Sequence, residues 1–281
     1  MTVASDRRIA REAIRRQRAR RGTLIAVLSS VIVLGGLALF VVTRPGWPDV
    51  QQTFFSWSVF VESFPGVLRG FWLDVKLFMV VEVVVLILGL VVAILRNTRS
   101  PALFPIRLLG TVFTDVMRGV PVILVVYLIG FGVPALGVTG VFADPVFLGG
   151  FALALCYTAY VAEVYRAGLD SVHPSQRAAA LAVGLTEGQS MRHVIAPQAV
   201  RRVVPPLLND FISLQKDVAL VSILGPQEAF RVAQIDAASD FNYTPFIAAA
   251  LLYLAVTVPL ARIVDHQQAK ARHRQGHSVQ A

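Results

Sequence analysis

Two aspartates interrupt an apolar segment of this 281-residue chain, Pro205–Leu224. Asp210 and Asp217 are seven residues apart, about two turns of an α-helix, so their side chains share one helix face. Asn209 and Lys216 repeat this spacing on the neighbouring stripe. If the segment crosses a membrane, such groups are costly there and usually serve a function. We assign Asp210 and Asn209 to contact with the amino group or basic side chain of a solute.

A structural interpretation of the remaining charges is also open. Lys216 can pair with Asp217, or contact Glu82 and Arg118 on other segments, and so hold helices together without meeting a solute. Paired charges are the common state inside membranes, so we predict an internal ion pair between Lys216 and Asp217. The candidates for a translocation path are therefore Asn209, Asp210, Lys216, Asp217 and Arg118.

Glu163 and Arg166 form a further candidate pair. Their spacing of three residues places them on the same face of a helix, where an ion pair can form. One interpretation is an ordinary surface ion pair. The other is a role beside the long connection that follows them in the sequence.

Motifs for several other chemistries are missing from the sequence. No G-x-x-x-x-G-K-[ST] run occurs, which excludes a P-loop nucleotide site. The five histidines include no His-x-x-x-His pair, which argues against a metal site. The single cysteine, Cys156, lies in an apolar segment, where a buried and inert thiol is expected. We therefore expect no enzyme active site and no cofactor bound by this chain.

The composition indicates which elements must position these residues. Apolar residues make up 56% of the chain and charged residues only 15%, against about a quarter in soluble domains. The mean hydropathy is +0.65. A water-soluble monomer of this composition would expose a large apolar surface. The sequence therefore predicts an all-α membrane protein with several spans.

Six segments are long and apolar enough to be predicted as membrane helices. A helix of about 20 residues reaches across the hydrocarbon layer. The third segment contains a kink at Gly119-Val120-Pro121, and the fifth carries the charges described above. The six segments are Thr23–Val42, Phe71–Leu95, 112–133, Pro145–Ala162, Pro205–Leu224 and Phe241–Ala261.

The distribution of positive charge predicts the orientation of these helices. With six spans and an internal start, 20 of the 26 Lys and Arg fall in cytoplasmic segments, so both termini are expected inside. Eight arginines occupy the arm 1–22, directly before the first helix at 23–43. Such a cluster could also bind nucleic acid, but no aromatic residues accompany it, so we expect no nucleic-acid partner. A basic tail at 265–281 ends the chain.

The connection between the fourth and fifth predicted spans contains signals for a helical hairpin. Pro174 begins an alanine-rich, helix-prone stretch that Gly184 ends. Thr186 and Gln189 match a capping box, which predicts a second helix that Pro197 would end. From the pattern alone, this hairpin either packs beneath its own bundle or offers its thin alanine face to another protein.

The run RAAALAVGLTEGQSMRHVIAPQAVRRVVPP (177–206) resembles the EAA loop of ATP-binding-cassette (ABC) importer permeases. That motif reads E-A-A-x-x-x-G, with a proline following later. Ala179 and Ala180 take its alanine positions, Gly184 its glycine and Pro197 its proline. Ala178 stands where the family usually has Glu, so one charge that could support the loop is missing.

Three further runs extend the resemblance to the polar amino-acid uptake permeases of the histidine and glutamine type. They are AYVAEVYRAGLDSV (159–172), VMRGVPVILVVYLIGFGVP (116–134) and FISLQKDVALVSILG (211–225). The resemblance implies a permease domain at 68–264, with five core helices and the coupling loop at about 170–200. The helix at 23–43 then lies outside this core, as an added anchor.

The resemblance also implies partners and a location. Two ATPase subunits, which carry the ATP and Mg, would dock on the loops of two paired permease chains. A solute-binding protein would deliver a polar amino acid from outside the bacterial inner membrane. Because selectivity would rest mainly on that protein, the sequence does not identify the amino acid.

Two other functions are weighed against this one. An ion-coupled secondary transporter could use Glu82, Asp210 and Asp217, but the sequence lacks the internal repeats common in that class. A membrane anchor without transport activity would not need buried charges. Reconstitution with and without an ATPase separates the three functions.

Overall fold

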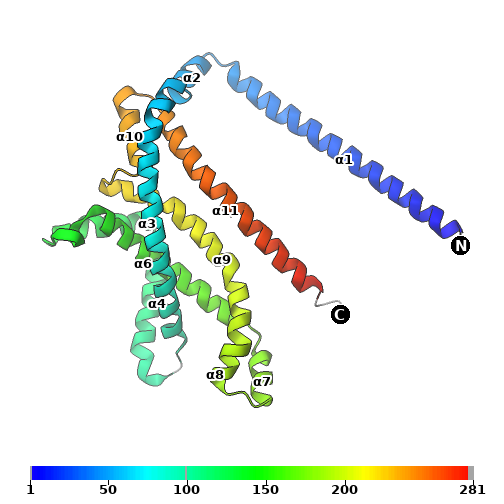
Figure 1. Ribbon diagram of the computed structural model, residues 1–281, viewed down its shortest axis with the longest axis vertical. Helices are drawn as coiled ribbons and strands as arrows, with labels where there is room; N and C mark the ends of the chain where they lie inside the picture. The colour runs from blue at the N-terminus through cyan, green and yellow to red at the C-terminus, as the bar shows by residue number, and fades with distance from the viewer. Residues whose placement is uncertain (1, 99, 278–281) are drawn as a thin grey trace. The chain divides into compact units, whose positions relative to one another are not determined.

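The computed structural model describes residues 2–98 and 100–277, with side chains described for 21–98, 100–266 and 268. These residues form helices, turns and short connections, and no strand occurs among them. The chain divides after Ser56 into two units, which are considered separately. Figure 1 shows the helices of both units along the chain.

The first unit consists of two helices, α1 (Thr2–Val42) and α2 (Trp47–Phe54). The part of α1 from Arg21 to Val42 is apolar and long enough to cross a membrane, as predicted for Thr23–Val42. Within this unit, the large apolar side chains of α1 after Arg21 are exposed. After α1, the guanidinium of Arg44 lies over the ring of Phe40, 3.8 Å from its centroid.

The second unit contains the remaining helices, and long helices alternate with short ones. α3 (Trp57–Asn97) and α6 (Pro145–Asp170) are its long central pair, which pack against each other. The other elements are η1 (Pro101–Leu103), α4 (Phe104–Gly119), α5 (Val122–Ala135), η2 (Gly140–Ala143), α7 (Pro174–Ala182), α8 (Glu187–Ser190), η3 (Met191–Ile195), α9 (Ala196–Asp217), η4 (Val218–Leu224), α10 (Ala229–Asp240) and α11 (Thr244–His277).

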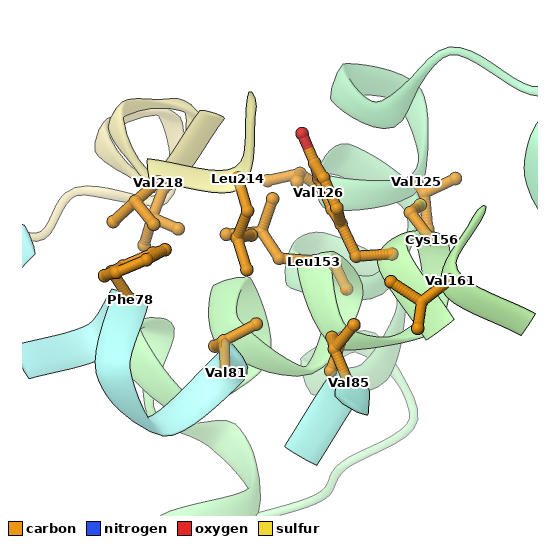
Figure 2. Packing of buried hydrophobic residues seen from close by; sticks show 14 residues of the cluster. Phe78, Val81, Val85, Val125, Val126, Leu153, Cys156, Val161, Leu214 and Val218 are labelled. Atoms are coloured by element: carbon orange, nitrogen blue, oxygen red, sulfur yellow. The ribbon is translucent and has the colours of Figure 1, made fainter. Parts of the chain in front are cut away.

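Helix α6 forms the centre of the second unit and contacts α3, α4, α5 and α9. Side chains from α3, α5, α6, α9 and η4 meet in one apolar core, which includes Val85, Val126, Leu153 and Leu214 (Figure 2). Cys156 lies in this core, fully buried and not in a disulfide, so the expected burial of its thiol is confirmed. The core fixes the helices that carry the polar residues.

Glycines allow the central helices to approach each other closely. A methyl group at Gly89 of α3 would lie 2.6 Å from Cγ1 of Val161 on α6. At Gly149 of α6, a methyl group would lie equally close to Cγ1 of Val221. Because lipid removes most of the hydrophobic drive for association, such close packing supplies much of the energy that joins membrane helices.

Several helices expose apolar side chains and are long enough to cross a membrane. In the described part of the chain, four stretches meet this condition, and a fifth does if the bent pair α4–α5 counts as one span. Helix α9 is not among them, because of its charges. The four stretches are Arg21–Val42, Trp47–Asn97, Pro145–Asp170 and Thr244–His266.

The third predicted span is not a single kinked helix. Its two halves, Pro101–Gly119 and Val122–Ala135, meet at an angle of 106°. Val120 between them is extended, with φ −97° and ψ 134°, because the ring of Pro121 excludes the helical conformation from the preceding residue. The expected kink is therefore a complete break, which we call the α4–α5 elbow.

The ends of two other predicted spans also differ. The fifth, expected to continue to Leu224, stops as an α-helix at Asp217 and continues as the tighter η4. Gly225, with φ +106° in the left-handed region, then ends η4. The last span begins at Thr244 rather than Phe241, which lies outside the helix with φ +50°.

Candidate functional site

The predicted hairpin is present, and its first helix and turn form as expected. Helix α7 begins at Pro174, after His173, whose ring nitrogen accepts a hydrogen bond from the Ser175 amide. Gly184 has φ +88°, a conformation that a side chain would strain. The amide of Leu185 donates to the carbonyl of Ala180 at 3.1 Å, which closes the end of α7.

The second helix of the hairpin begins with the predicted capping box. The Gln189 amide donates to Thr186 Oγ1 at 3.3 Å, and the Thr186 amide donates to Gln189 Oε1 at 2.9 Å. Both free amides at this helix start are thereby satisfied. An ion pair between Arg177 Nη2 and Glu187 Oε2, 2.8 Å long, links α7 to α8.

The expectation that Pro197 ends the second helix is wrong. The chain passes from α8 through the π-helical turn η3 directly into α9, and Pro197 lies in the first turn of α9. A proline is tolerated where its missing N–H is not required. The π-helical turn η3 is wider than an α-helical turn, since the Ala196 amide donates to the Met191 carbonyl five residues earlier. After such a turn, the N–H that Pro197 lacks is not required. The hairpin is therefore joined to the bundle by a continuous helical segment, η3 and the first turns of α9, which we call the hairpin arm.

The hairpin presents one exposed side and one packed side. Ala178, Ala179, Gly184 and Pro197 are exposed, whereas Ala180 is buried. The exposed side also carries apolar side chains, namely Leu181, Val183 and Met191, of which Val183 is 79% exposed. On the packed side, Ile195 and Ala199 meet Val172 in a small buried cluster. The geometry leaves an apolar surface available to another protein.

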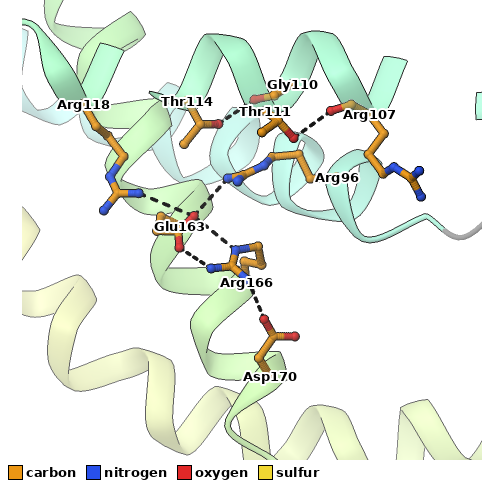
Figure 3. A network of polar contacts seen from close by, with 9 residues as sticks. All are labelled: Arg96, Arg107, Gly110, Thr111, Thr114, Arg118, Glu163, Arg166 and Asp170. Atoms are coloured by element: carbon orange, nitrogen blue, oxygen red, sulfur yellow. Dashed lines mark hydrogen bonds and ion pairs between the residues drawn. The ribbon is translucent and has the colours of Figure 1, made fainter. Parts of the chain in front are cut away.

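Glu163 and Arg166 form the expected ion pair on α6, with Arg166 Nη2 at 2.5 Å from Glu163 Oε1. The pair belongs to a larger network (Figure 3). Arg96 of α3 and Arg118 of α4 also contact Glu163 Oε2, at 3.0 and 3.6 Å, and Arg166 contacts Asp170. No role for Arg96 is predicted from the sequence, and Arg118 lies in this network rather than in the predicted translocation path.

The predicted ion pair between Lys216 and Asp217 is not formed. Asp217 Oδ2 accepts a 2.8 Å hydrogen bond from the hydroxyl of Tyr157 on α6. Lys216 is exposed, and among the residues with described side chains it forms no ion pair. A neutral partner from another helix thus takes the place of the adjacent lysine.

Asp210 lies two turns earlier on α9 and has a different environment. It is half-buried, and its Oδ2 is shielded from solvent without a hydrogen-bond partner in the described part of the chain. The buried carboxyl of Glu82 on α3 is close enough to repel it. Asn209, beside it, is exposed. An unsatisfied carboxyl oxygen next to a second carboxyl favours a cationic group as ligand.

A buried acidic pair also joins α3, α10 and α11, which sequence reasoning missed. Asp74 Oδ2 accepts a hydrogen bond of 2.7 Å from the hydroxyl of Tyr253. Glu228, which is 1% exposed, accepts the amides of Phe230 and Arg231 and so caps α10. Burial, together with the neighbouring Asp74 carboxyl, raises the pKa of Glu228 to about 8. Only the polarity of position 74 within an apolar stretch gave any sequence signal.

The fold and site together define a polytopic helical membrane protein with an exposed, capped hairpin connected rigidly to its core. The sequence pattern of the family described as "binding-protein-dependent transport system inner membrane component" matches residues 85–273. The chain therefore belongs to this family of ABC importer permeases.

Curated relatives cover most of the same region. The chain is 31% identical over 208 residues to the arginine transport system permease protein ArtQ of Bacillus subtilis, covering 73% of this chain and 92% of that protein. It is 36% identical over 186 residues to the probable amino-acid ABC transporter permease protein PatM of Vibrio harveyi, covering 66% and 82%.

Solved structures show the same fold. A chain of an amino acid ABC transporter crystallised with histidines is 30% identical, with a TM-score of 0.69, and the match covers 75% of this chain and 96% of that one. A chain of the inward-facing methionine transporter MetNI is 20% identical, with a TM-score of 0.57, covering 73% and 95%. The latter likeness concerns the fold alone.

Proposed function

We propose that this chain is the transmembrane permease subunit of an ABC importer for polar amino acids. The capped hairpin α7–α8, continuous with α9 and thus with the bundle, carries this proposal. Its membership of a binding-protein-dependent transport family and its amino-acid permease relatives support it.

In this function, the hairpin receives the ATPase subunit. The chain lacks a nucleotide-binding loop, so ATP and Mg would be held by that partner. Val183 and Met191 are apolar and exposed, a suitable surface for protein contact, while Arg177–Glu187 stiffens the hairpin. Closure of two ATPase subunits would then shift the bundle between inward-open and outward-open states.

The proposed membrane topology has six helices with both termini in the cytoplasm of a bacterial cell. Five helices form the permease domain at 68–264, and the helix at 23–43 is an added anchor. Helix α9 is not apolar enough to be identified as a membrane span by composition, because of its charges. Each charge costs about 2.5–3.5 kcal/mol at the centre of an isolated membrane helix. Packing against α6 and α11 supports its insertion.

A second permease chain, identical or similar, and an extracytoplasmic solute-binding protein complete the proposed complex. Asn209 and Lys216 of α9 are exposed in the single chain, although α9 contacts both α6 and α11. A polar stripe of this kind in a membrane bundle fits a water-filled path or a partner chain better than lipid.

We place the substrate path along α9, with Asp210 as its cation-binding residue. Asp210 Oδ2, which has no hydrogen-bond partner among the described residues, supports this role. Asp217 instead holds α9 to α6 through Tyr157, so it supports the path without meeting the solute.

The decisive experiment is reconstitution into proteoliposomes. The chain would be combined with an ATPase and a binding protein from the same genome, and uptake of labelled polar amino acids measured. Uptake that requires ATP and both partners supports the proposal. Gradient-driven uptake by the chain alone would instead favour an ion-coupled transporter, for which the close Glu82 and Asp210 carboxyls are the specific argument.

A further inference from the structure

A single carboxylate, that of Glu163, is shared by arginines from three helices. Arg96 of α3 contacts Oε2 at 3.0 Å and Arg118 of α4 contacts it at 3.6 Å. Arg166, on α6 itself, contacts both oxygens, with Nε 3.2 Å from Oε2 and Nη2 2.5 Å from Oε1. Figure 3 shows the three guanidinium groups converging on this side chain. The contacts of Arg96 and Arg166 are charge-assisted hydrogen bonds, which are about twice as strong as neutral ones, whereas Arg118 forms a longer ion pair.

The two arginines from other helices occupy equivalent positions. Arg96 is the last residue but one of α3, which ends at Asn97, and Arg118 is the last but one of α4, which ends at Gly119. Glu163 therefore attaches α6 to the ends of both helices. Arg118 lies directly before the α4–α5 elbow, whose backbone is extended at Val120.

The same end of α6, just beyond Glu163, contacts the start of α9, which continues from the hairpin. Glu163 lies about two turns before the end of α6 at Asp170. Beyond it, a methyl group at Gly168 would collide with Val203 of α9, so the two helices are in backbone-close contact. The guanidinium of Arg202 donates to the carbonyl of Ser171. The start of α9, which continues from the hairpin, is thus in direct contact with the end of α6.

The three arginines hold Glu163 with unequal strength. The Arg96 side chain is only 9% exposed and lies at 3.0 Å, whereas Arg118 is 40% exposed and lies at 3.6 Å. A buried ion pair resists separation because an unpaired charge would remain in the protein interior. An exposed, longer contact can open at little cost. The link to the elbow is therefore the part of this network that can change between two states.

We propose that Glu163 is a positioning residue for coupling, which carries the movement of the hairpin to the α4–α5 elbow through Arg118. Arg96 and Arg166 keep its carboxylate in place, and the Arg118 contact forms in one state of the transport cycle and opens in the other. The elbow in turn carries Val125 and Val126 of α5, which lie in the apolar core. Hairpin and core then move together rather than independently.

This inference rests on the proposed function, and its test uses the full complex in proteoliposomes with binding protein and ATPase. The readout is the number of solute molecules taken up per ATP hydrolysed. Arg118→Gln and Glu163→Gln should lower this ratio about fivefold or more, the usual range of a coupling energy. Arg118→Lys, which retains the charge, should restore much of it. Asp170→Asn is the matched control, because among the residues with described side chains the ion pair of Asp170 is with Arg166 on its own helix.

The outcomes separate a coupling role from a structural one. A purely structural role would reduce the yield of folded complex and lower uptake and hydrolysis together, with the ratio unchanged, and this would overturn the inference. If Glu163→Gln fails to assemble, the exposed Arg118→Gln decides alone. Absence of ATP-dependent uptake in the unmodified complex would instead refute the proposed function. A wild-type ratio in the assembled Arg118→Gln complex overturns the inference only.

Discussion

The hydroxyl of Tyr157 on α6 donates a 2.8 Å hydrogen bond to Asp217 Oδ2 at the end of α9. This bond gives the second aspartate of α9 a structural partner, while the first, Asp210, has a buried oxygen that no group in the described part of the chain contacts by a hydrogen bond. Two aspartates on one helix face thus have different environments. The difference separates a residue that holds the bundle together from one available to a ligand.

Loss of the Tyr157 hydroxyl should destabilise the protein. Tyr157→Phe keeps the ring in the core but leaves the Asp217 carboxylate without its hydrogen bond, so we expect a free energy of unfolding lower by about 1 kcal/mol. Thermal unfolding in detergent measures this effect. Tyr127→Phe on α5 is the matched control, because this tyrosine is 45% exposed. Equal unfolding temperatures for the two variants would contradict the assignment.

Neutralising Asp210 should weaken transport without affecting the ATPase. Asp210→Asn keeps the shape of the side chain but removes the charge that attracts a cationic group. We expect the apparent KM for uptake by the reconstituted complex to rise about tenfold, which corresponds to about 1.4 kcal/mol. Basal ATP hydrolysis should stay the same, since Asp210 lies about four helical turns along α9 from Ala196, where the helix begins. Asp240→Asn, at the exposed end of α10, serves as control. Unchanged uptake kinetics would remove Asp210 from the path.

The hairpin could be predicted from the sequence because its signals are local. A left-handed glycine and a capping box act on backbone groups within about four residues of themselves. Gly184, Thr186 and Gln189 therefore specify the turn and the next helix whatever surrounds them. The place of Pro197 could not be predicted, because whether a proline ends a helix here depends on the hydrogen bonding of the turn before it. The switch from α to π hydrogen bonding at η3 depends on how the arm packs, which no local pattern records.

The polar contacts between helices could not be predicted, because they depend on packing. Arg96 and Glu163 are 67 residues apart, and no spacing rule relates them. For Asp217, the adjacent Lys216 was the natural partner, yet α6 places a tyrosine hydroxyl closer. Composition gave the membrane class and the repeated apolar segments gave the long helices. The choice of partner within the bundle required the three-dimensional structure.

The stability of the protein should fall as the pH rises through the range in which Glu228 ionises. Burial, reinforced by the Asp74 carboxyl, raises the pKa of Glu228 from 4.5 to about 8 in the folded state. The folded protein therefore binds a proton that the unfolded chain releases, and stability decreases between about pH 4.5 and 8. Unfolding temperatures in detergent across this range test the trend. Glu228→Gln, which is neutral at every pH, should reduce this slope, and an unaltered slope would exclude Glu228 as a source of it.

The turn at Gly184 should be required for coupling but not for membrane insertion. Its φ of +88° is disfavoured for any side chain, and proline cannot adopt it. Gly184→Pro, or deletion of residues 178–185, should therefore displace the exposed side of the hairpin and abolish solute-stimulated ATP hydrolysis. Gly188→Ala is the matched control, since a methyl group there meets no atom within 4 Å and φ is not positive. Normal stimulation in a correctly inserted Gly184→Pro complex would show that the ATPase does not act through this hairpin.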